Sequence, residues 1–296
     1  MSINAPTHFV QQYSTNVDLL LQEMGPKLRP FVSTGTHVGK AASPLNQIGS
    51  VSMRSVTSRF TSKTATNASY DRRWVYPSDF SLDQQLDNFD QLKMITDPKS
   101  PYARNAAMAA GRKMDELVIE AALGDAKTGE NGGTTESFDT TNYSIAADLG
   151  ASGDVGLTVE KLIEAQKIFQ DANVDLEMEK PTIVIAPKQH ADLLRQTEVV
   201  SRDFNDRPAL VKGMVTEFMG FNIVVSNQLD VVSTDQRTCF AFVQSGLYLG
   251  IWNEIQSDAH QRFDLEANPW ELTTTLSAGA TRLEQGKIIR VLCDEG

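Results

Sequence analysis

Cysteine and histidine are scarce in this sequence, which contains two cysteines and four histidines in 296 residues. Cys239 and Cys293 lie far apart in apolar contexts. In a reducing compartment this pattern predicts two small buried side chains rather than a disulfide or a metal pair. No histidine has a metal-ligand neighbour at helical spacing. We therefore expect no metal and no cofactor, and packing or surface roles for His8, His37, His190 and His260.

Long apolar runs and catalytic motifs are also missing. No apolar segment approaches the about 20 residues that a membrane span needs. Residues 1–10 lack the basic start and apolar block of a signal peptide, which predicts a protein made and kept in a cytoplasm. The glycines of 35–40 and 279–287 do not have the spacing of a phosphate-binding loop, and no Gly-x-Ser-x-Gly elbow occurs. Nothing here indicates an active site.

The composition allows a folded protein with a sizeable core. The apolar fraction is 41%, the charged fraction is 22% and the net charge is −11. A chain of this length suffices for one large domain or two modest ones. The acidic balance argues against tight DNA binding, but it is compatible with a protein that encloses DNA without binding it tightly.

The first 80 residues have little apolar periodicity of their own. Residues 1–48 read as an extended arm, with one short helix over 17–24 that ends at Gly25-Pro26. Residues 49–80 read as a ribbon of two strands, 50–60 and 69–76, joined by a loop over 61–68. Neither strand has a convincing apolar face. A two-stranded ribbon of that kind is marginal by itself and needs a partner surface.

Charge is unevenly distributed around the ribbon. The ribbon is basic, and the stretch that follows it is acidic, with aspartates from Asp79 to Asp97. One interpretation is a pair of solvated surfaces. The other is a basic ribbon that docks on an acidic neighbouring subunit. The candidate contact residues are Arg54, Arg59, Lys63, Arg72, Arg73, Asp83, Asp87 and Asp90.

The rest of the chain has clearer periodicity. An alanine-rich apolar stripe predicts a long helix over 101–124, capped by Ser100 and closed by Gly124. Residues 125–157, rich in Gly, Thr, Ser and Asp, predict a long surface loop. Residues 158–252 alternate helices and strands, with a helix capped by Thr158, a buried strand over 181–186 and a helix that begins at Pro187. Further strands are expected over 219–226, 239–252, 270–280 and 287–293. The fold class predicted is α+β.

The order of these elements resembles the Hong Kong 97-type capsid fold of tailed bacteriophages. Local stretches add to the resemblance: 182–194, 213–227 and 279–295, the last similar to the C-terminal strands of podophage-type coat proteins. The resemblance implies an N-terminal arm over 1–48 and an extended β-ribbon loop (E-loop) over 49–80. It further implies a peripheral domain over 81–157 and 253–296 with a spine helix over 101–124, and an axial domain over 158–252.

The resemblance also implies a function. It predicts a major capsid protein, not an enzyme, that self-assembles into an icosahedral shell of hexamers and pentamers around double-stranded DNA, without sequence-specific binding. Implied partners are a separate scaffolding protein and a portal protein at one vertex, with a decoration protein as a further candidate; no membrane is involved. The expected location is the virion, after assembly in the host bacterial cytoplasm. Alternatives are an encapsulin-type nanocompartment shell, although no cargo-docking pocket is found, and an α/β hydrolase with His190 or His260 as base.

Overall fold

The computed structural model describes residues 22–40, 42–56, 58–59, 62–63, 65–86, 99–196, 216–233, 235–266 and 268–296. It is a mixed fold of helices and three sheets, as the predicted α+β class requires. Most of the short helix expected over 17–24 lies outside the described residues, and residues 22–24 are not helical. No helix in the described part of the chain is long and apolar enough to cross a membrane.

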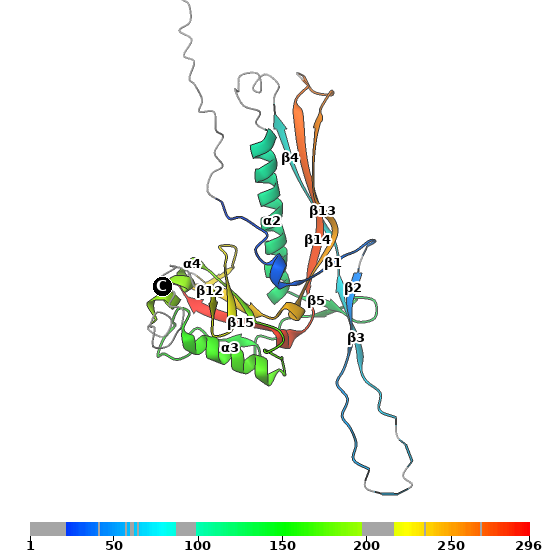
Figure 1. The fold of residues 1–296 in the computed structure, drawn as a ribbon, viewed down its shortest axis with the longest axis vertical. Coiled ribbons are helices and arrows are strands. Elements are labelled where there is room, and N and C mark those ends of the chain that lie inside the picture. Colours follow the sequence, from blue (N-terminus) through cyan, green and yellow to red (C-terminus); the bar gives the residue numbers. More distant parts are fainter. Residues whose placement is uncertain are drawn as a thin grey trace, which may run out of the picture.

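A seven-stranded sheet together with the helices α3 and α4 forms one part of the molecule (Figure 1). Thr158 caps α3 by accepting a hydrogen bond from the backbone N–H of Lys161, and Pro187 begins α4, both as predicted. The apolar strand β8 is buried along its whole length and pairs with β10 and β12. The elements are β7 (Ser144–Ile145), α3 (Val159–Asp171), β8 (Thr182–Ile185), α4 (Pro187–Arg195), β9 (Glu217–Phe218), β10 (Phe221–Val225), β11 (Val231–Ser233), β12 (Gln236–Phe242) and β15 (Ile288–Asp294).

A long helix and a four-stranded sheet form the second part (Figure 1). The helix is α2 (Lys99–Leu123), so the predicted long helix is confirmed, although Ser100 lies inside it and not at its cap. Its 25 residues span about 37 Å at 1.5 Å per residue. Gly124 closes it through a hydrogen bond to Glu120 O. α2 packs along β13 and β14 in the sheet β1 (Ser33–Thr36), β13 (Leu247–Gln261), β14 (Trp270–Arg282) and β4 (Ser78–Leu86).

The third sheet corrects the predicted ribbon. Its strands are β2 (Ala42–Ile48), β3 (Tyr70–Val75), β5 (Ala126–Thr128) and β6 (Thr134–Glu136), in that order. The strand expected over 69–76 is therefore β3, but its partner is β2 and not the segment 50–60. The described residues between 49 and 69 contain no strand. The polar pattern of 50–60 predicts a strand, whereas strand pairing ends at the Ile48–Tyr70 pair.

The segment 125–157 also differs from the prediction. It was expected to be one long surface loop, yet it contributes β5, β6 and β7 to two sheets. Ala126, Ile145, Ala147 and Leu157 are buried. These isolated apolar residues are too few to show a period, which is why the composition alone indicated a loop.

Two strands of the C-terminal region do not follow the predicted domain boundary at 252/253. β13 begins before that boundary and runs through it. β15, expected with the peripheral part, instead pairs with β12 and belongs to the seven-stranded sheet. The short 3-10 turns η3 (Gln244–Gly246) and η4 (Gln285–Lys287) connect the seven-stranded sheet directly to the four-stranded sheet. A further 3-10 turn, η1 (Arg29–Phe31), precedes β1.

One apolar core joins the two larger parts. It contains Met114 and Val118 of α2 together with Phe169 of α3 and Phe240 of β12. Cys239 and Cys293 are free and buried in the same core, as the sequence predicts. The segment between β2 and β3 projects away from this core (Figure 1).

Candidate functional site

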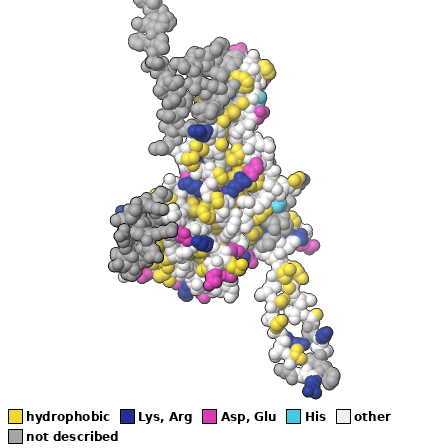
Figure 2. Space-filling view, in the orientation of Figure 1, with side chains coloured by type: hydrophobic (Ala, Val, Ile, Leu, Met, Phe, Trp, Pro, Cys, Tyr) yellow, Lys and Arg dark blue, Asp and Glu magenta, His cyan; other side chains and the backbone are white. Residues whose placement is uncertain are grey.

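The segment between β2 and β3, residues 49–69, projects from the body of the molecule (Figure 1), and we call it the extended loop. Its sequence contains no Asp or Glu and three basic residues. Arg54, Arg59 and Lys63 are all exposed. Figure 2 shows basic and hydrophobic side chains along the loop. The extended loop is therefore positively charged, and its basic side chains lie at the surface.

The extended loop also exposes apolar side chains. Val51 and Val56 are 61% and 72% exposed, and Met53 is fully exposed. Ile48 and Tyr70, the last pair of the ribbon, are 67% and 77% exposed. Contiguous exposed apolar side chains on a projecting segment mark a surface that another molecule covers.

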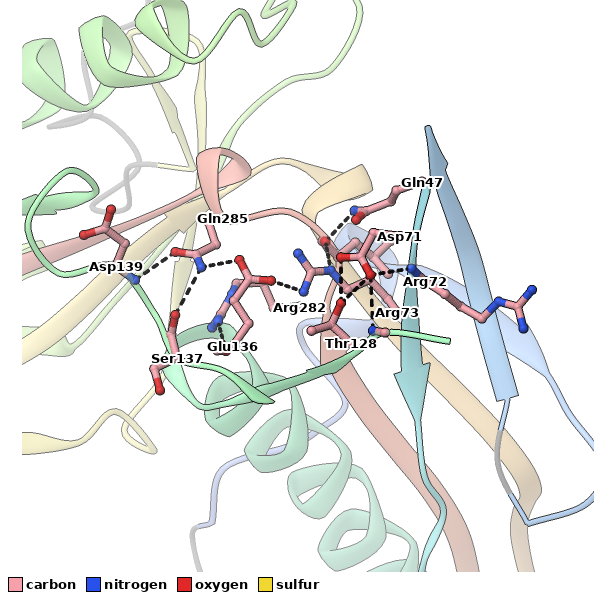
Figure 3. Close-up of polar contacts among 12 residues, drawn as sticks. Gln47, Asp71, Arg72, Arg73, Thr128, Glu136, Ser137, Asp139, Arg282 and Gln285 are labelled. Atoms are coloured by element: carbon pink, nitrogen blue, oxygen red, sulfur yellow. Dashed lines mark hydrogen bonds and ion pairs between the residues drawn. The ribbon is translucent and has the colours of Figure 1, made fainter. Parts of the chain in front are cut away.

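The base of the extended loop is held by a polar network, which we call the root (Figure 3). Arg73 of β3 is buried, pairs with Glu136 of β6 and donates through Nε to Leu283 O at 2.8 Å. Gln285 donates to the same Glu136 carboxylate. Arg282, also buried, donates to Glu136 O at 2.9 Å. The root thus ties the ribbon to the turn between β14 and β15.

A second set of contacts fixes the ribbon to β5. Asp71 accepts hydrogen bonds from the Thr128 hydroxyl at 2.6 and 2.7 Å and from Gly129 N at 3.2 Å (Figure 3). Gln47 of β2 donates to Leu283 O at 2.7 Å. Arg72 lies over the Trp74 ring, with its Cζ 5.7 Å from the centroid. The loop therefore leaves the body at a defined place.

The root carboxylates are stabilised in their charged form. Burial raises the pKa of Glu136, but hydrogen bonds from Arg73 and Gln285 outweigh it and leave the pKa below its ordinary value. Burial likewise raises the pKa of Asp71, and the bonds from Thr128, Arg72 N and Gly129 N bring it below normal. Both groups hold the loop at neutral pH as anions.

One face of the four-stranded sheet is polar and acidic, and we call it the outer sheet face. Antiparallel register places opposite residues on the same side, so Asp83, Thr273 and Asp258 lie in one row across β4, β14 and β13. The opposite face carries Phe80 and Leu276, which pack toward α2. The outer sheet face comprises Asp79, Ser81, Asp83, Gln85, Asn253, Gln256, Asp258, His260, Glu271, Thr273, Thr275 and Ser277.

The predicted contact residues divide into three groups. Arg54, Arg59 and Lys63 lie on the extended loop and Asp83 on the outer sheet face, all exposed. Arg73 is wrong as a contact residue, because it is buried and pairs within its own chain. Arg72 is half-buried against Asn46 and Trp74. Asp87 and Asp90 lie outside the described residues.

Sequence reasoning missed most of the root. Glu136, Arg282 and Gln285 lie in segments read as a loop or as strand ends. The one available signal is the polar run Thr281 to Lys287 between two apolar strands. It marks a turn, but nothing in it indicates that Arg282 is buried.

No catalytic arrangement is found among the described residues. His37 Nε2 lies 2.6 Å from Tyr248 Oη, and His260 faces Glu271 at 3.4 Å on the outer sheet face. Burial lowers the pKa of His190 on α4. A cleft of about 1000 Å³ beside the root is lined by carboxylates but by no histidine or cysteine of the described chain. No group of three or more metal-ligating side chains occurs in the described residues either.

Comparison with known proteins agrees with the fold. The capsid of cyanophage P-SCSP1u matches with a TM-score of 0.72 at 16% identity, over 98% of this chain and 94% of that chain. The capsid of cyanophage Pam1 matches with a TM-score of 0.71 at 9% identity, over 95% of both chains. The capsid of Ralstonia phage GP4 matches with a TM-score of 0.65 at 10% identity, over 100% of this chain and 98% of that chain. No curated protein matches.

The expected Hong Kong 97-type capsid fold is thereby confirmed. A family model described as "Phage capsid protein" matches residues 5–295, nearly the whole sequence. The chain belongs to the phage capsid protein family.

Proposed function

We propose that this chain is the major capsid protein of a tailed, double-stranded DNA bacteriophage, and that it assembles into an icosahedral shell of hexamers and pentamers. The observation that carries this proposal is the extended loop, which exposes Val51, Met53 and Val56 together with three basic side chains. A soluble monomer gains nothing from such a loop, whereas a neighbouring subunit would cover it. The family match supports the same conclusion.

The parts of the fold correspond to those of a capsid subunit. We assign the residues before β2 to the N-terminal arm. We assign β2, β3 and the extended loop to the E-loop. α2 with the four-stranded sheet forms the peripheral domain, and the seven-stranded sheet with α3 and α4 forms the axial domain. On this assignment β15 belongs to the axial domain, because it pairs with β12.

The extended loop docks on the outer sheet face of the next subunit. The loop carries three positive charges and no negative one, whereas the outer sheet face exposes Asp79, Asp83 and Asp258. Complementary charge of this kind fixes the register of an interface and speeds its formation. Loop and face are different surfaces of one chain, so their contact is head-to-tail, and a rotation that closes gives a ring.

The remaining partners follow from this role. A separate scaffolding protein guides assembly in the host cytoplasm, a portal protein occupies one vertex and a decoration protein can coat the shell. The mature chain resides in the virion, and the acidic protein encloses DNA without sequence-specific binding. The role is structural and not enzymatic. The similar structures are phage capsids, which favours a genome shell over an encapsulin-type compartment.

Charge reversal tests the docking proposal. The variant R54E/R59E/K63E should fold normally but assemble poorly, since its loop would meet an acidic face. A matched control, K167E/K180E/R195E, also reverses three positive charges. These lie at exposed positions of the part that contains the seven-stranded sheet. Adding Asp79→Lys, Asp83→Lys and Asp258→Lys to the loop variant should restore shells. Normal shell yield of the loop variant at low salt would refute the docking site.

A further inference from the structure

One edge of the four-stranded sheet has no partner strand in the described part of the chain. β4 is the last strand of this sheet and pairs only with β14. Its nine residues pair without a register shift, so the free edge is regular along its whole length. An edge of this kind presents a row of backbone N–H and C=O groups that can pair with a strand from another chain.

The opposite edge of the sheet is less suited to strand addition. β1 pairs with β13 only from Tyr248 to Ile251, and beyond that point β13 has no second partner strand among the described residues. Register shifts lie there, between Ile251 and Asn253 and between Asn253 and Gln256. Such irregularities twist an edge away from a flat partner. β4 is therefore the better acceptor strand.

The two sides of the β4 edge differ in chemistry. Asp79 and Asp83 lie on the outer sheet face and are exposed. Phe80 and Leu82 lie on the opposite face, where Phe80 packs against the apolar core and Leu82 remains 36% exposed. Pairing between two copies of β4 would bring aspartates close to aspartates, which is unfavourable. The edge instead fits a strand that is basic on one side and apolar on the other.

The extended loop contains a segment with this pattern. In an extended strand, Val51 and Met53 point to one side, and Arg54 points to the other side with two serines. The sequence predicts a strand here, over 50–60, but the described part of the loop forms none in the single chain. A strand needs partners to be stable, and this segment has none of its own. A partner edge on another chain would supply what is missing.

We propose that residues 50–54 of one copy of this chain add as a fifth strand to the free edge of β4 in a second copy. A register that puts Arg54 beside Asp83 on the outer sheet face puts the two apolar side chains of the segment on the face of Leu82. This holds for both strand directions, because successive residues alternate between the faces in either case. Main-chain hydrogen bonds give such an addition its affinity, and the alternating side chains give its specificity.

This inference rests on the proposed function, since it specifies how the extended loop docks on the next subunit. The backbone of β4 then belongs to the docking site together with the aspartates beside it. The hydrogen-bond pattern distinguishes this mode, because alternate residues of an antiparallel edge strand direct their N–H and C=O groups to the free edge. A loop that docked through side chains alone would protect no alternating set of amides.

A synthetic peptide with the sequence of residues 49–59 tests strand addition on the unassembled full chain. Backbone hydrogen exchange, resolved by residue with NMR, should slow at alternate amides of β4 and stay unchanged over residues 256–261 of β13. The matched control is the same peptide with N-methyl groups on Ser52 and Met53, which keeps every side chain and the charge. Adjacent residues direct their N–H groups to opposite sides, so one of the two lost donors belongs to the new ladder. This control should protect β4 far less.

Three results would overturn strand addition. One is an N-methylated peptide that protects β4 as well as the parent peptide, and another is a parent peptide that protects none of the β4 amides. The third comes from assembled shells, where alternate β4 amides should exchange more slowly than in the unassembled chain and equal rates would contradict the proposal. Shells that form with unprotected β4 would leave the proposed function standing and remove only strand addition.

Discussion

Gly111 of α2 and Gly25, in the segment before η1, meet backbone to backbone. A Cβ on Gly111 would lie 2.3 Å from Gly25 O, and a Cβ on Gly25 would lie 2.5 Å from Gly111 C. Neither clash involves a flexible side chain, so the chain would have to move apart to relieve it. The two glycines therefore let the segment around Gly25 lie directly on the helix.

Replacing Gly111 by alanine should destabilise the protein, although alanine is the better helix former by about 1 kcal/mol. Overpacking at a site that cannot relax costs about 1–3 kcal/mol, and we expect that cost to outweigh the helical gain. Thermal and denaturant unfolding of Gly111→Ala measure the net effect. The control Ala107→Gly, at an exposed position of the same helix, should show the propensity difference alone. A Gly111→Ala protein more stable than the parent would contradict the close approach.

The root should loosen in acid. The folded-state pKa of Glu136 lies below its ordinary value of 4.5, so its stabilising contribution is complete above that pH. It is lost as the pH falls through the lowered pKa, when the proton removes the pair with Arg73. Hydrogen exchange at β3 and β5 between pH 6 and 3 should show declining protection. The variant Glu136→Gln should show weaker protection at pH 6 and a flatter profile, and an equally steep profile would argue against this role.

Lys161 should matter far more than its surface neighbour. Its ammonium is fully buried and donates to Val155 O, Gly156 O and Leu292 O at 2.7–2.9 Å. In Lys161→Met these carbonyls lose their partner, at a cost of about 2–4 kcal/mol. Lys167→Met on the same helix changes an exposed side chain and should stay within about 0.5 kcal/mol. Equal stability of the two variants would show that water replaces the ammonium.

Lys63 raises the question of covalent cross-linking, because the type member of the fold joins a ribbon lysine to an asparagine of another subunit. That chemistry needs a carboxylate in an apolar pocket to take the proton. Lys63 is exposed on the loop, and the candidate asparagines Asn253 and Asn268 are not distinguished by the sequence. We expect mature shells to run as one band near 32.6 kDa on a denaturing gel. A ladder that disappears in Lys63→Ala would instead identify Lys63 as the cross-linked residue.

The sequence predicts the periodic parts of this fold well and its contacts poorly. α2, α3, α4 and β8 follow directly from apolar stripes, the Thr158 cap and Pro187, because these signals are local. The pairing of β2 with β3 and of β15 with β12 depends on residues far apart in sequence, where local pattern gives no register. Arg73 shows the same limit. Its charge suggests a surface position, whereas its pairing with Glu136, 63 residues away in sequence, makes burial possible.

Electron cryo-microscopy of the chain expressed in bacteria with a scaffolding protein tests the central claim most directly. We expect closed icosahedral shells of hexamers and pentamers in which Arg54, Arg59 and Lys63 of one subunit lie on Asp79, Asp83 and Asp258 of the next. Shells with the extended loop on another surface would contradict the docking site alone. A chain that remains a stable monomer, in that expression and in the virion fraction, would contradict the whole account.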